Sequence, residues 1–301
     1  MKVLEVDVSA GLLERWRGWF APEVQPFRTT TLAGRLAAEV PTQRNHEPSD
    51  EVRDTFFLYA GVPIWLTESE FVGLSIQVRR ALLAGREATG RARQLSDSVV
   101  AQVGWARTDS RIVWWPSLLH KVGDEPLIFH VEEGVAPSRH REVTDATWAA
   151  ARRVLPGAAR LAGTFPDASG PNCFGTVMAA AGVEGAETRW MVQEPFETWL
   201  AQRSTPMEGT AQDHLPGVVL VWRDTTNLAV HAAVTVGGQY CLSKPSQAWC
   251  SPRLVWTVRE TIDANRRRGQ TLSRYLINPD FGERTDATPT PADQVSWPSV
   301  G

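Results

Sequence analysis

Apolar side chains recur at helical spacing in three stretches of the first hundred residues. Each stretch follows a residue that can cap a helix, namely Ser9, Ser49 or Thr67. Thr67 and Glu70 form a capping-box pattern, in which each side chain accepts the other residue's backbone N–H. We expect helices whose apolar sides pack together, with a docking face for a partner as the alternative. The apolar residues are Leu12, Leu13, Trp16 and Trp19, then Val52, Phe56, Phe57 and Tyr59, and then Phe71, Leu74, Val78 and Leu82.

From about residue 109 the pattern becomes that of strands. Short runs are rich in β-branched and aromatic residues, which favour extended chain. Gly237 and Gly238 follow one such run, and a tight hairpin turn needs positive φ at both central positions, so we expect a hairpin there. The expected strands span residues 111–115, 126–131, 218–222, 230–236, 239–243 and 254–258.

Helices are expected between these strands. Thr144 and Asp145 open one helix, and Pro195 can begin another. Asn172 to Ala181 reads as a short helix that Gly182 ends, and residues 259–268 read as a charged helix. This mixture predicts an α+β protein. Residues 283–301, rich in Thr, Pro and Asp, are expected to form a flexible tail.

Composition supports a globular protein with about two domains. The 301 residues are 43% hydrophobic and 22% charged. Thirty-one Lys and Arg stand against 34 Asp and Glu, a net charge of −3. Nucleic acids and anionic membranes attract basic proteins, so this balance argues against both as partners. No apolar run approaches the roughly 18 residues of a membrane helix.

Cysteine usage and the first residues bear on the compartment. Three cysteines are an odd number and too few for a disulfide framework, so we expect all three to be reduced. Glu5 and Asp7 stand where a signal peptide needs an apolar core, which favours a cytoplasmic protein. The chain lacks the Cys and His spacings of zinc sites, so we expect no metal and no cofactor. The sequence leaves the oligomeric state open.

Cys173 is the first candidate for chemistry. It stands just inside the predicted helix N-terminus, after a Gly-Pro turn. Unpaired backbone amides and the helix dipole favour the thiolate there, and the same amides can hold an oxyanion. The alternative is a buried, unreactive cysteine. Cys241, in a predicted strand, and Cys250, in a loop, fit packing or surface roles better.

His231 is the candidate base. It lies inside a predicted strand, where a polar ring faces either a satisfied niche in the core or a cleft. A thiol nucleophile needs a base, which usually comes from a distant stretch of sequence. We therefore expect Cys173 and His231 to form a pair, with a structural histidine as the alternative.

The segments around these two residues resemble the NlpC-type cysteine peptidases of the papain-like superfamily. Gly170-Pro171-Asn172-Cys173-Phe174-Gly175 opens a helix, as an Asp-Cys-Ser-Gly-like motif does in that family. The run His231-Ala-Ala-Val-Thr-Val-Gly-Gly is similar to the family's histidine hairpin, and residues 215–222 look like the strand that precedes it. The resemblance covers residues 160–260, and it implies a papain-like core with a Cys at a helix N-terminus against an antiparallel sheet.

The resemblance also implies a third catalytic residue. In the family a polar residue on the next strand orients the histidine, and the matching position is Ser243. A serine can make one hydrogen bond to the imidazole, although it orients the ring less firmly than a carboxylate or amide does. The sequence departs from the family at Asn172, where Asp is usual. Residues expected near the substrate are Asn172, Asp224, Lys244, Gln247 and Trp249.

Together these observations predict three regions and a function. The regions are a mostly helical part (1–120), a papain-like catalytic core (121–282) and the tail (283–301). The function is a thiol hydrolase or acyl-transfer enzyme, close to a cysteine peptidase or thiol protease, acting on a small peptide or amide substrate. Two alternatives remain: a catalytically inactive papain-like fold that binds a peptide or partner, and an interaction protein in which Cys173 is simply buried.

Overall fold

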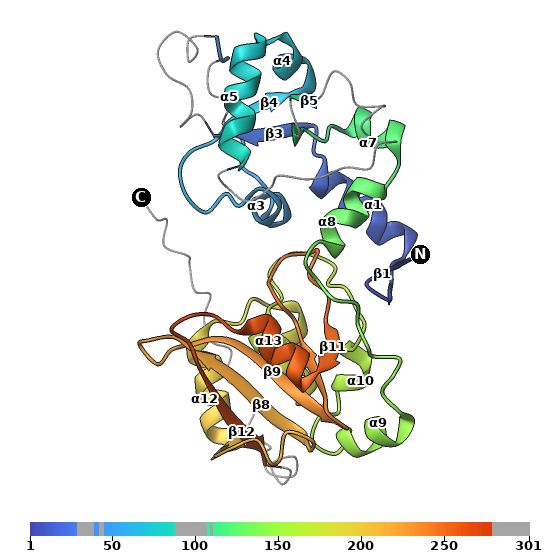
Figure 1. Cartoon of the computed structure of the whole chain (residues 1–301), viewed down its shortest axis with the longest axis vertical. Coiled ribbons are helices and arrows are strands. Elements are labelled where there is room, and N and C mark those ends of the chain that lie inside the picture. Colours follow the sequence, from blue (N-terminus) through green and yellow to red (C-terminus); the bar gives the residue numbers. More distant parts are fainter. Residues whose placement is uncertain (29–38, 42–44, 88–106, 109–110, 279–301) are drawn as a thin grey trace.

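The computed structural model describes residues 1–28, 39–41, 45–87, 107–108 and 111–278. Figure 1 shows two parts, one above the other: a mostly helical part built from the first half of the chain, and a part built around a six-stranded sheet. The described residues contain eleven α-helices, and every pairing in the six-stranded sheet is antiparallel. The predicted α+β class is therefore confirmed.

Local capping signals determine where several helices of the first part begin. The side chains of Ser9 and Ser49 accept the backbone N–H groups of Leu12 and Val52, and Thr67 forms the predicted capping box with Glu70. The elements are β1 (Lys2–Val3), β2 (Val6–Asp7), α1 (Ala10–Phe20), β3 (Val24–Phe27), α3 (Asp50–Phe56), β4 (Ile64–Thr67), α4 (Glu68–Gly73), α5 (Ile76–Glu87), β5 (Arg107–Thr108), β6 (Arg111–Ile112), α7 (Pro116–Val122) and α8 (Glu125–Glu132).

Two strand predictions fail in this part. Residues 126–131 form most of helix α8, because Leu127 and Val131 are four residues apart and both enter the same core, while Pro126 fits a first helical turn. For residues 111–115 the prediction holds only at β6. The chain then turns into α7, which begins at Pro116.

The second part contains the large sheet and the helices around it. Its strand order is β11-β10-β9-β8-β12-β7. The strands predicted at 218–222, 230–236, 239–243 and 254–258 are present, whereas β7 and β12 were not predicted. The elements are α9 (Asp145–Ala151), α10 (Ala158–Leu161), α11 (Cys173–Ala180), η1 (Ala186–Thr188), α12 (Gln193–Arg203), β7 (Ser204–Met207), β8 (Pro216–Arg223), β9 (Ala229–Gly237), β10 (Tyr240–Ser243), β11 (Leu254–Thr257), α13 (Val258–Asn265) and β12 (Thr271–Ile277).

The β9–β10 hairpin turns one residue later than the glycine pair suggests. Its two central residues are Gly238 and Gln239, with φ of 57° and 70°. Both values are positive, as the tight hairpin turn requires. Gly237 instead ends β9, with a φ of 95°.

Successive residues of β9 pack on opposite sides of the sheet. Ala232, Val234 and Val236 belong to the apolar cluster that includes α11, whereas Ala233 belongs to the cluster on the side of α13. We call these the α11 face and the α13 face. Because side chains alternate along a strand, a shift of one residue moves a group from one face to the other.

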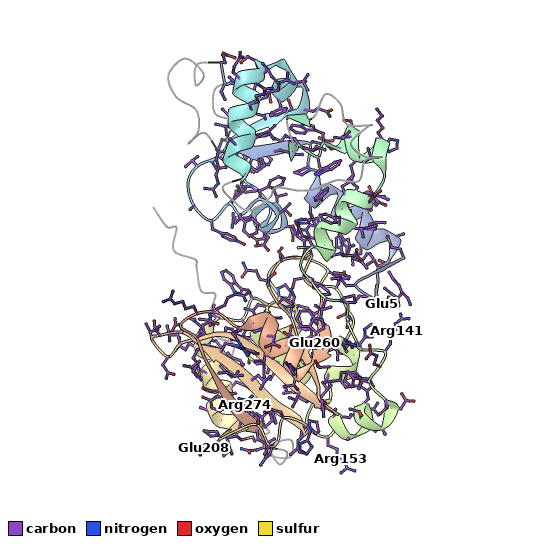
Figure 2. The ribbon with its side chains drawn as sticks, in the orientation of Figure 1. Glu5, Arg141, Arg153, Glu208, Glu260 and Arg274 are labelled. Carbon is purple, nitrogen blue, oxygen red and sulfur yellow. The ribbon has the colours of Figure 1, made fainter. Side chains whose placement is uncertain are left out.

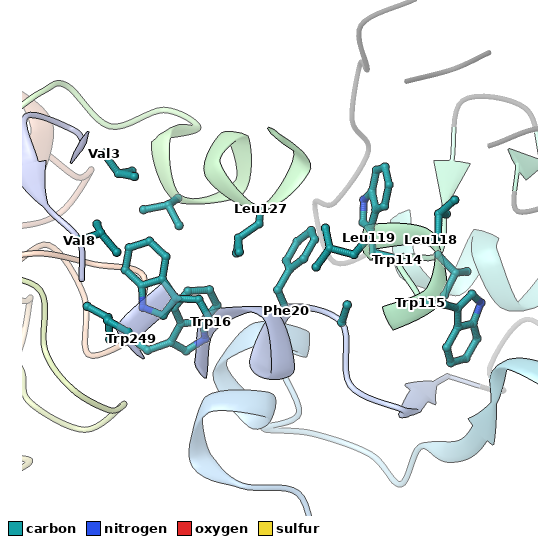
Figure 3. Close-up of a cluster of buried hydrophobic side chains, with 14 of the residues drawn as sticks. Val3, Val8, Trp16, Phe20, Trp114, Trp115, Leu118, Leu119, Leu127 and Trp249 are labelled. Atoms are coloured by element: carbon teal, nitrogen blue, oxygen red, sulfur yellow. The ribbon is translucent and has the colours of Figure 1, made fainter. Parts of the chain in front are cut away.

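The loop between β10 and β11 joins the two parts. It carries Trp249 into the core of the first part, where Figure 3 shows it beside Trp16. The indole contacts Trp16 and Trp19 at centroid distances of 5.5 and 5.6 Å. At another point of the junction the Arg141 guanidinium donates to the Asp7 carboxylate over 2.8 Å, on the side of the molecule where Figure 2 labels Glu5 and Arg141.

Within the described ranges, no helix has both the length and the apolar character needed to cross a membrane. The predicted tail, residues 283–301, lies outside the described residues.

Candidate functional site

Cys173 is the first residue of α11, as the sequence predicts. Asn172 caps the helix, because its Oδ1 accepts the N–H of Gly175 over 3.0 Å. The other end of the same amide, Nδ2, donates to the carbonyl oxygen of Met191 over 2.7 Å. Both ends of the Asn172 amide are therefore engaged inside the protein, so this side chain holds α11 in place instead of facing a substrate.

The Cys173 thiol is almost fully covered, with 8% of the residue exposed. Burial raises the pKa of the thiol to about 11, because the thiolate is poorly solvated there. Backbone N–H groups of Ala232 and Phe174 and the charge of Lys244 lower that pKa, but by less than burial raises it. At neutral pH the resting side chain is thus a thiol, whereas a nucleophile would be a thiolate.

His231 lies on the α13 face. Its ring packs against Trp222 at a centroid distance of 5.1 Å, and its Nε2 is 3.4 Å from the Ser243 hydroxyl. Burial lowers the pKa of His231 to about 4, and the charge of Arg267 acts in the same direction. The structure thus brings His231 and Ser243 together, as a neutral pair under α13.

The structure does not bring Cys173 and His231 together. Cys173 packs on the α11 face, where the β9 residue beside it is Ala232, and His231 points to the other face. The physical reason is the alternation of the strand, because neighbouring residues of β9 face opposite sides. The predicted Cys173–His231–Ser243 triad is therefore not assembled in this arrangement.

Lys244 follows the last residue of β10, is completely buried, and donates from Nζ to the carbonyl oxygens of Ser246 and Ala248 over 2.5 and 3.3 Å. Burial lowers the pKa of Lys244 to about 7, and the charge of Arg253 lowers it further. Cys173 is among the groups whose charge affects it. The sequence analysis named Lys244 only as a residue near the substrate.

Gln247 connects this region to the first part of the molecule. Its Nε2 donates to the Tyr59 hydroxyl over 3.1 Å and to the Asp54 carboxylate over 3.4 Å, and its carbonyl oxygen accepts the N–H of Gly170. Burial raises the pKa of Asp54. Gln247 therefore takes part in a polar contact between α3 and two loops, one of which leads to α11. Its predicted role near a substrate stays a prediction.

Two other residues expected near the substrate have structural surroundings instead. Asp224 lies at the exposed tip of the β8–β9 hairpin, where its Oδ1 accepts the N–H groups of Thr226 and Leu228. Trp249 is fully buried, and its Nε1 donates to the Thr55 hydroxyl over 2.8 Å. Trp249, which the sequence analysis placed near a substrate, fills the core of the first part and presents no exposed surface.

Four exposed apolar side chains lie near α11, and the sequence analysis did not single them out. Trp190, Val192, Leu228 and Val230 are 57%, 53%, 49% and 37% exposed. We call this set the apolar shelf. The sequence carries no local signal for half of it, because Trp190, Met191 and Val192 are consecutive apolar residues outside any strand.

Two hydrogen bonds connect the segments that carry the apolar shelf. Gln193 Nε2 donates to the carbonyl oxygen of Ala229 over 2.9 Å, which joins the start of α12 to β9. Ala229 is buried in the core of the α11 face, and Met191 packs against that core. The bond from Asn172 to Met191 links the same segment to the cap of α11.

In the part of the chain that the structure describes, no group of three or more His, Cys, Asp and Glu side chains could hold a metal ion. Cys173, Cys241 and Cys250 are thiols, and burial raises the pKa of Cys241 to about 12.

A comparison with protein families, curated proteins and solved structures finds no match to this chain. The resemblance to NlpC-type cysteine peptidases, and the papain-like core that it implies, therefore stay predictions from the sequence motifs.

Proposed function

We propose that this protein binds a peptide segment of a partner at the apolar shelf, without nucleophilic attack by a Cys173–His231 pair. The observation that supports it best is the exposure of Trp190, Val192, Leu228 and Val230 on two segments that the Gln193–Ala229 hydrogen bond joins. Large apolar side chains left exposed on neighbouring segments are one mark of an interaction site.

The shelf has the properties of a binding surface as well as its composition. Trp190 is a residue type that often carries much of the binding energy of an interface, because one side chain covers a large area at a small entropy cost. Beneath the shelf, Met191 and Ala229 are anchored in the core, so the outward side chains stand on a rigid base. A partner would therefore gain apolar contact without first having to order the site.

The same geometry weakens the case for a hydrolase that uses His231. The imidazole lies on the α13 face, and burial keeps the pKa of the Cys173 thiol near 11. A general base must come within hydrogen-bonding reach of the proton that it removes. Of the functions that the sequence suggests, a peptide- or partner-binding module therefore fits best.

Selection from a random peptide library displayed on phage tests this proposal. We expect the native protein to enrich peptides with an aromatic or branched apolar anchor. Trp190→Ser should weaken the binding of the enriched peptides about tenfold or more, because it removes the largest contact of the shelf. Val72→Ser is the matched control, since Val72 is an exposed apolar residue of α4, outside the shelf.

Two outcomes would contradict the proposal. One is a selection that enriches no apolar anchor. The other is an enriched peptide that binds the Trp190→Ser variant as tightly as the native protein, which would place its site elsewhere.

A further inference from the structure

A cleft of about 880 Å³ runs along α13. Its walls are one side of that helix, the β9–β10 turn, the loop that precedes β8 and the middle of β12. The described residues that line it include no member of the apolar shelf and none of the predicted triad. Small-molecule sites commonly enclose about 300 to 1,000 Å³, so the cleft has the size for such a ligand.

Arg274 contributes a guanidinium to the cleft. It lies between Leu272 and Leu276 of β12, which pack on the α13 face, so alternation directs it to the same face. Its side chain is only 11% exposed, and its Nε and Nη2 donate to the two carboxylate oxygens of Asp213 over 2.8 and 3.0 Å. These bonds use one edge of the planar group. Its Nη1 makes no hydrogen bond to a described residue, so this nitrogen can donate to a second acceptor.

The charges that line the cleft do not cancel. Arg259, Arg266 and Arg274 stand against Asp213 and Asp263, which leaves one positive charge in a chain whose net charge is −3. Asp213 is taken up by Arg274. Asp263 lies between the other two arginines, 3.8 Å from Arg259 and 3.2 Å from Arg266, so one carboxylate serves two guanidinium groups. The cleft therefore has the capacity for one more negative charge.

Gln239 lines the cleft from an unfavourable backbone conformation. Its φ of 70° lies in the left-handed region, which glycine adopts without strain and glutamine does not. Its carbonyl oxygen accepts the N–H of Val258 over 2.8 Å, a bond that a glycine would make equally well. Its side-chain amide has no hydrogen-bond partner among the described residues. Strain at a residue whose side chain does nothing for the fold indicates a functional constraint.

An apolar strip lies beside these polar groups. Val258 and Ile262 are four residues apart on α13, and both line the cleft. Val258 is buried in the core of the α13 face, and Ile262 packs against that core while it stays half-buried. A ligand with an apolar body would cover what Ile262 leaves exposed.

We propose that this cleft binds a small monocarboxylate that has an apolar body. The carboxylate accepts hydrogen bonds from the arginines, the Gln239 amide donates a further one, and the apolar body lies on Ile262. A single negative charge neutralises the cleft, whereas a cation would be repelled by the excess arginine. The site is separate from peptide binding at the apolar shelf, and neither proposal depends on the other.

4-Phenylbutyrate is a suitable probe for the full-length protein, because it joins one carboxylate to an apolar body. An NMR titration of the ¹⁵N-labelled protein follows the backbone amides of Gln239, Val258 and Ile262. Two partial probes complete the test: acetate has the charge without the body, and 4-phenylbutanamide has the body without the charge. We expect 4-phenylbutyrate to shift these amides with a Kd about tenfold lower than that of either partial probe.

Gln239→Gly separates a role in binding from a role in the fold. It should keep or raise the melting temperature, because glycine relieves the strain, and it should weaken the binding of 4-phenylbutyrate about threefold. Asn227→Gly is the matched control. Asn227 has a φ of 67° in the β8–β9 hairpin, outside the cleft, so the same backbone change there should leave the affinity unchanged.

Two charge variants should move the affinity in opposite directions. Arg266→Gln should weaken the binding of 4-phenylbutyrate about threefold, because it removes one donor and one positive charge. Asp263→Asn should tighten it about threefold, because Arg259 and Arg266 lose the carboxylate that they share. Arg268→Gln is the control, since it removes an exposed arginine two residues away that does not line the cleft.

Four results would overturn the proposal. The first is a titration in which 4-phenylbutyrate shifts none of the three amides. The second is acetate with an equal Kd, which would reduce the cleft to a site for counterions. The third is native affinity in the Gln239→Gly variant. The fourth is an Arg268→Gln variant that loses as much affinity as Arg266→Gln, which would show attraction to the general charge of α13.

Discussion

On the α13 face of the sheet, His231 lies against Trp222 and beside Ser243. After the end of β10, Lys244 is buried, and its Nζ donates to backbone carbonyl oxygens. The two regions thus hold their polar groups differently: one pairs two side chains under an aromatic ring, and the other fastens a side chain to a loop.

The comparison shows that one strand can place chemically different side chains on the two sides of a sheet. The residues at 231 and 232 are neighbours in sequence but face opposite sides of one sheet. The α13 face keeps an imidazole neutral inside a closed core. In the other region, burial lowers the pKa of the Lys244 amine, so a large fraction of it is neutral near pH 7. Titration separates the two regions, because burial lowers the pKa of His231 to about 4 and that of Lys244 to about 7.

The largest expected effect on stability is at Trp222, which packs against the His231 imidazole. Trp222→Ala should lower the free energy of unfolding by about 3 to 5 kcal/mol, because it leaves a cavity in the α13 face. Water should then reach His231 and raise its pKa toward the value of an exposed histidine. Urea unfolding and an NMR titration of His231 measure the two effects.

Phe196→Ala is the matched change on the α11 face. Phe196 is fully buried there, so its loss of stability should be similar, but the pKa of His231 should stay where it is. A Trp222→Ala variant with an unmoved His231 pKa would contradict the assignment of the ring to the α13 face.

Acid should destabilise the folded protein through His231, on the α13 face. The unfolded chain binds a proton at His231 below about pH 6.5, while the folded protein resists until about pH 4. The contribution of His231 to stability is therefore complete above pH 6.5 and is lost as the pH falls to 4, by about 3 kcal/mol. Urea unfolding at several pH values measures it. His231→Asn should lack this part of the slope, and an identical slope in both proteins would refute it.

Mild alkali should raise the contribution of Lys244 to the free energy of unfolding. From pH 7 to 9 the unfolded chain keeps a proton on Lys244 that the folded protein has lost, so the contribution of this amine to stability should rise by about 2 kcal/mol. In the same range the cysteines of the unfolded chain begin to ionise, at a pKa of about 8.5, while burial keeps Cys173 and Cys241 protonated in the folded protein, which opposes the rise. Lys244→Met keeps the cysteines, so in urea unfolding its stability should fall relative to that of the native protein by about 2 kcal/mol between pH 7 and 9. Identical pH profiles in the two proteins would mean that the amine stays charged inside.

The smallest effects compare one hydrogen-bonding side chain on each face. Asn172→Ala should cost about 1 kcal/mol, because α11 loses its cap. Ser243→Ala should cost about 0.5 kcal/mol, since its contact with His231 is long at 3.4 Å. Thermal unfolding of both variants measures the difference. A larger loss at Ser243 would show that the histidine depends on the hydroxyl more than the geometry indicates.

Features that depend on a few neighbouring residues could be predicted from the sequence. The caps at Ser9, Ser49 and Thr67 were predicted because each acts within one turn of its own helix. Cys173 was placed at a helix N-terminus for the same reason. The run at 126–131 was not predicted correctly, because a short apolar run fits a strand or a helix until the core that it enters is known.

Which side of a sheet a strand residue faces depends on tertiary packing. For this reason the structure does not bring His231 to Cys173, although the sequence predicts that they pair. The motif around His231 indicates a strand but not which side of the strand meets α11. The surroundings of Trp249 depend on tertiary structure too, since its indole contacts Trp16 and Trp19, which lie far away in the sequence. Local sequence contains neither piece of information.

The insertion of Trp249 has a consequence for synthesis. Its hydrogen bond to Thr55 spans 194 positions of the chain. During synthesis on the ribosome, the core of the first part cannot be completed until residue 249 has emerged, because Trp249 is part of that core. Closing such a long loop costs conformational entropy before the Trp249 indole makes its contacts. This step is therefore slower than the formation of the local helices. The amino-terminal half is thus the first to be made and among the last to be completed, and during that interval its tryptophan-rich interior is open to chaperones.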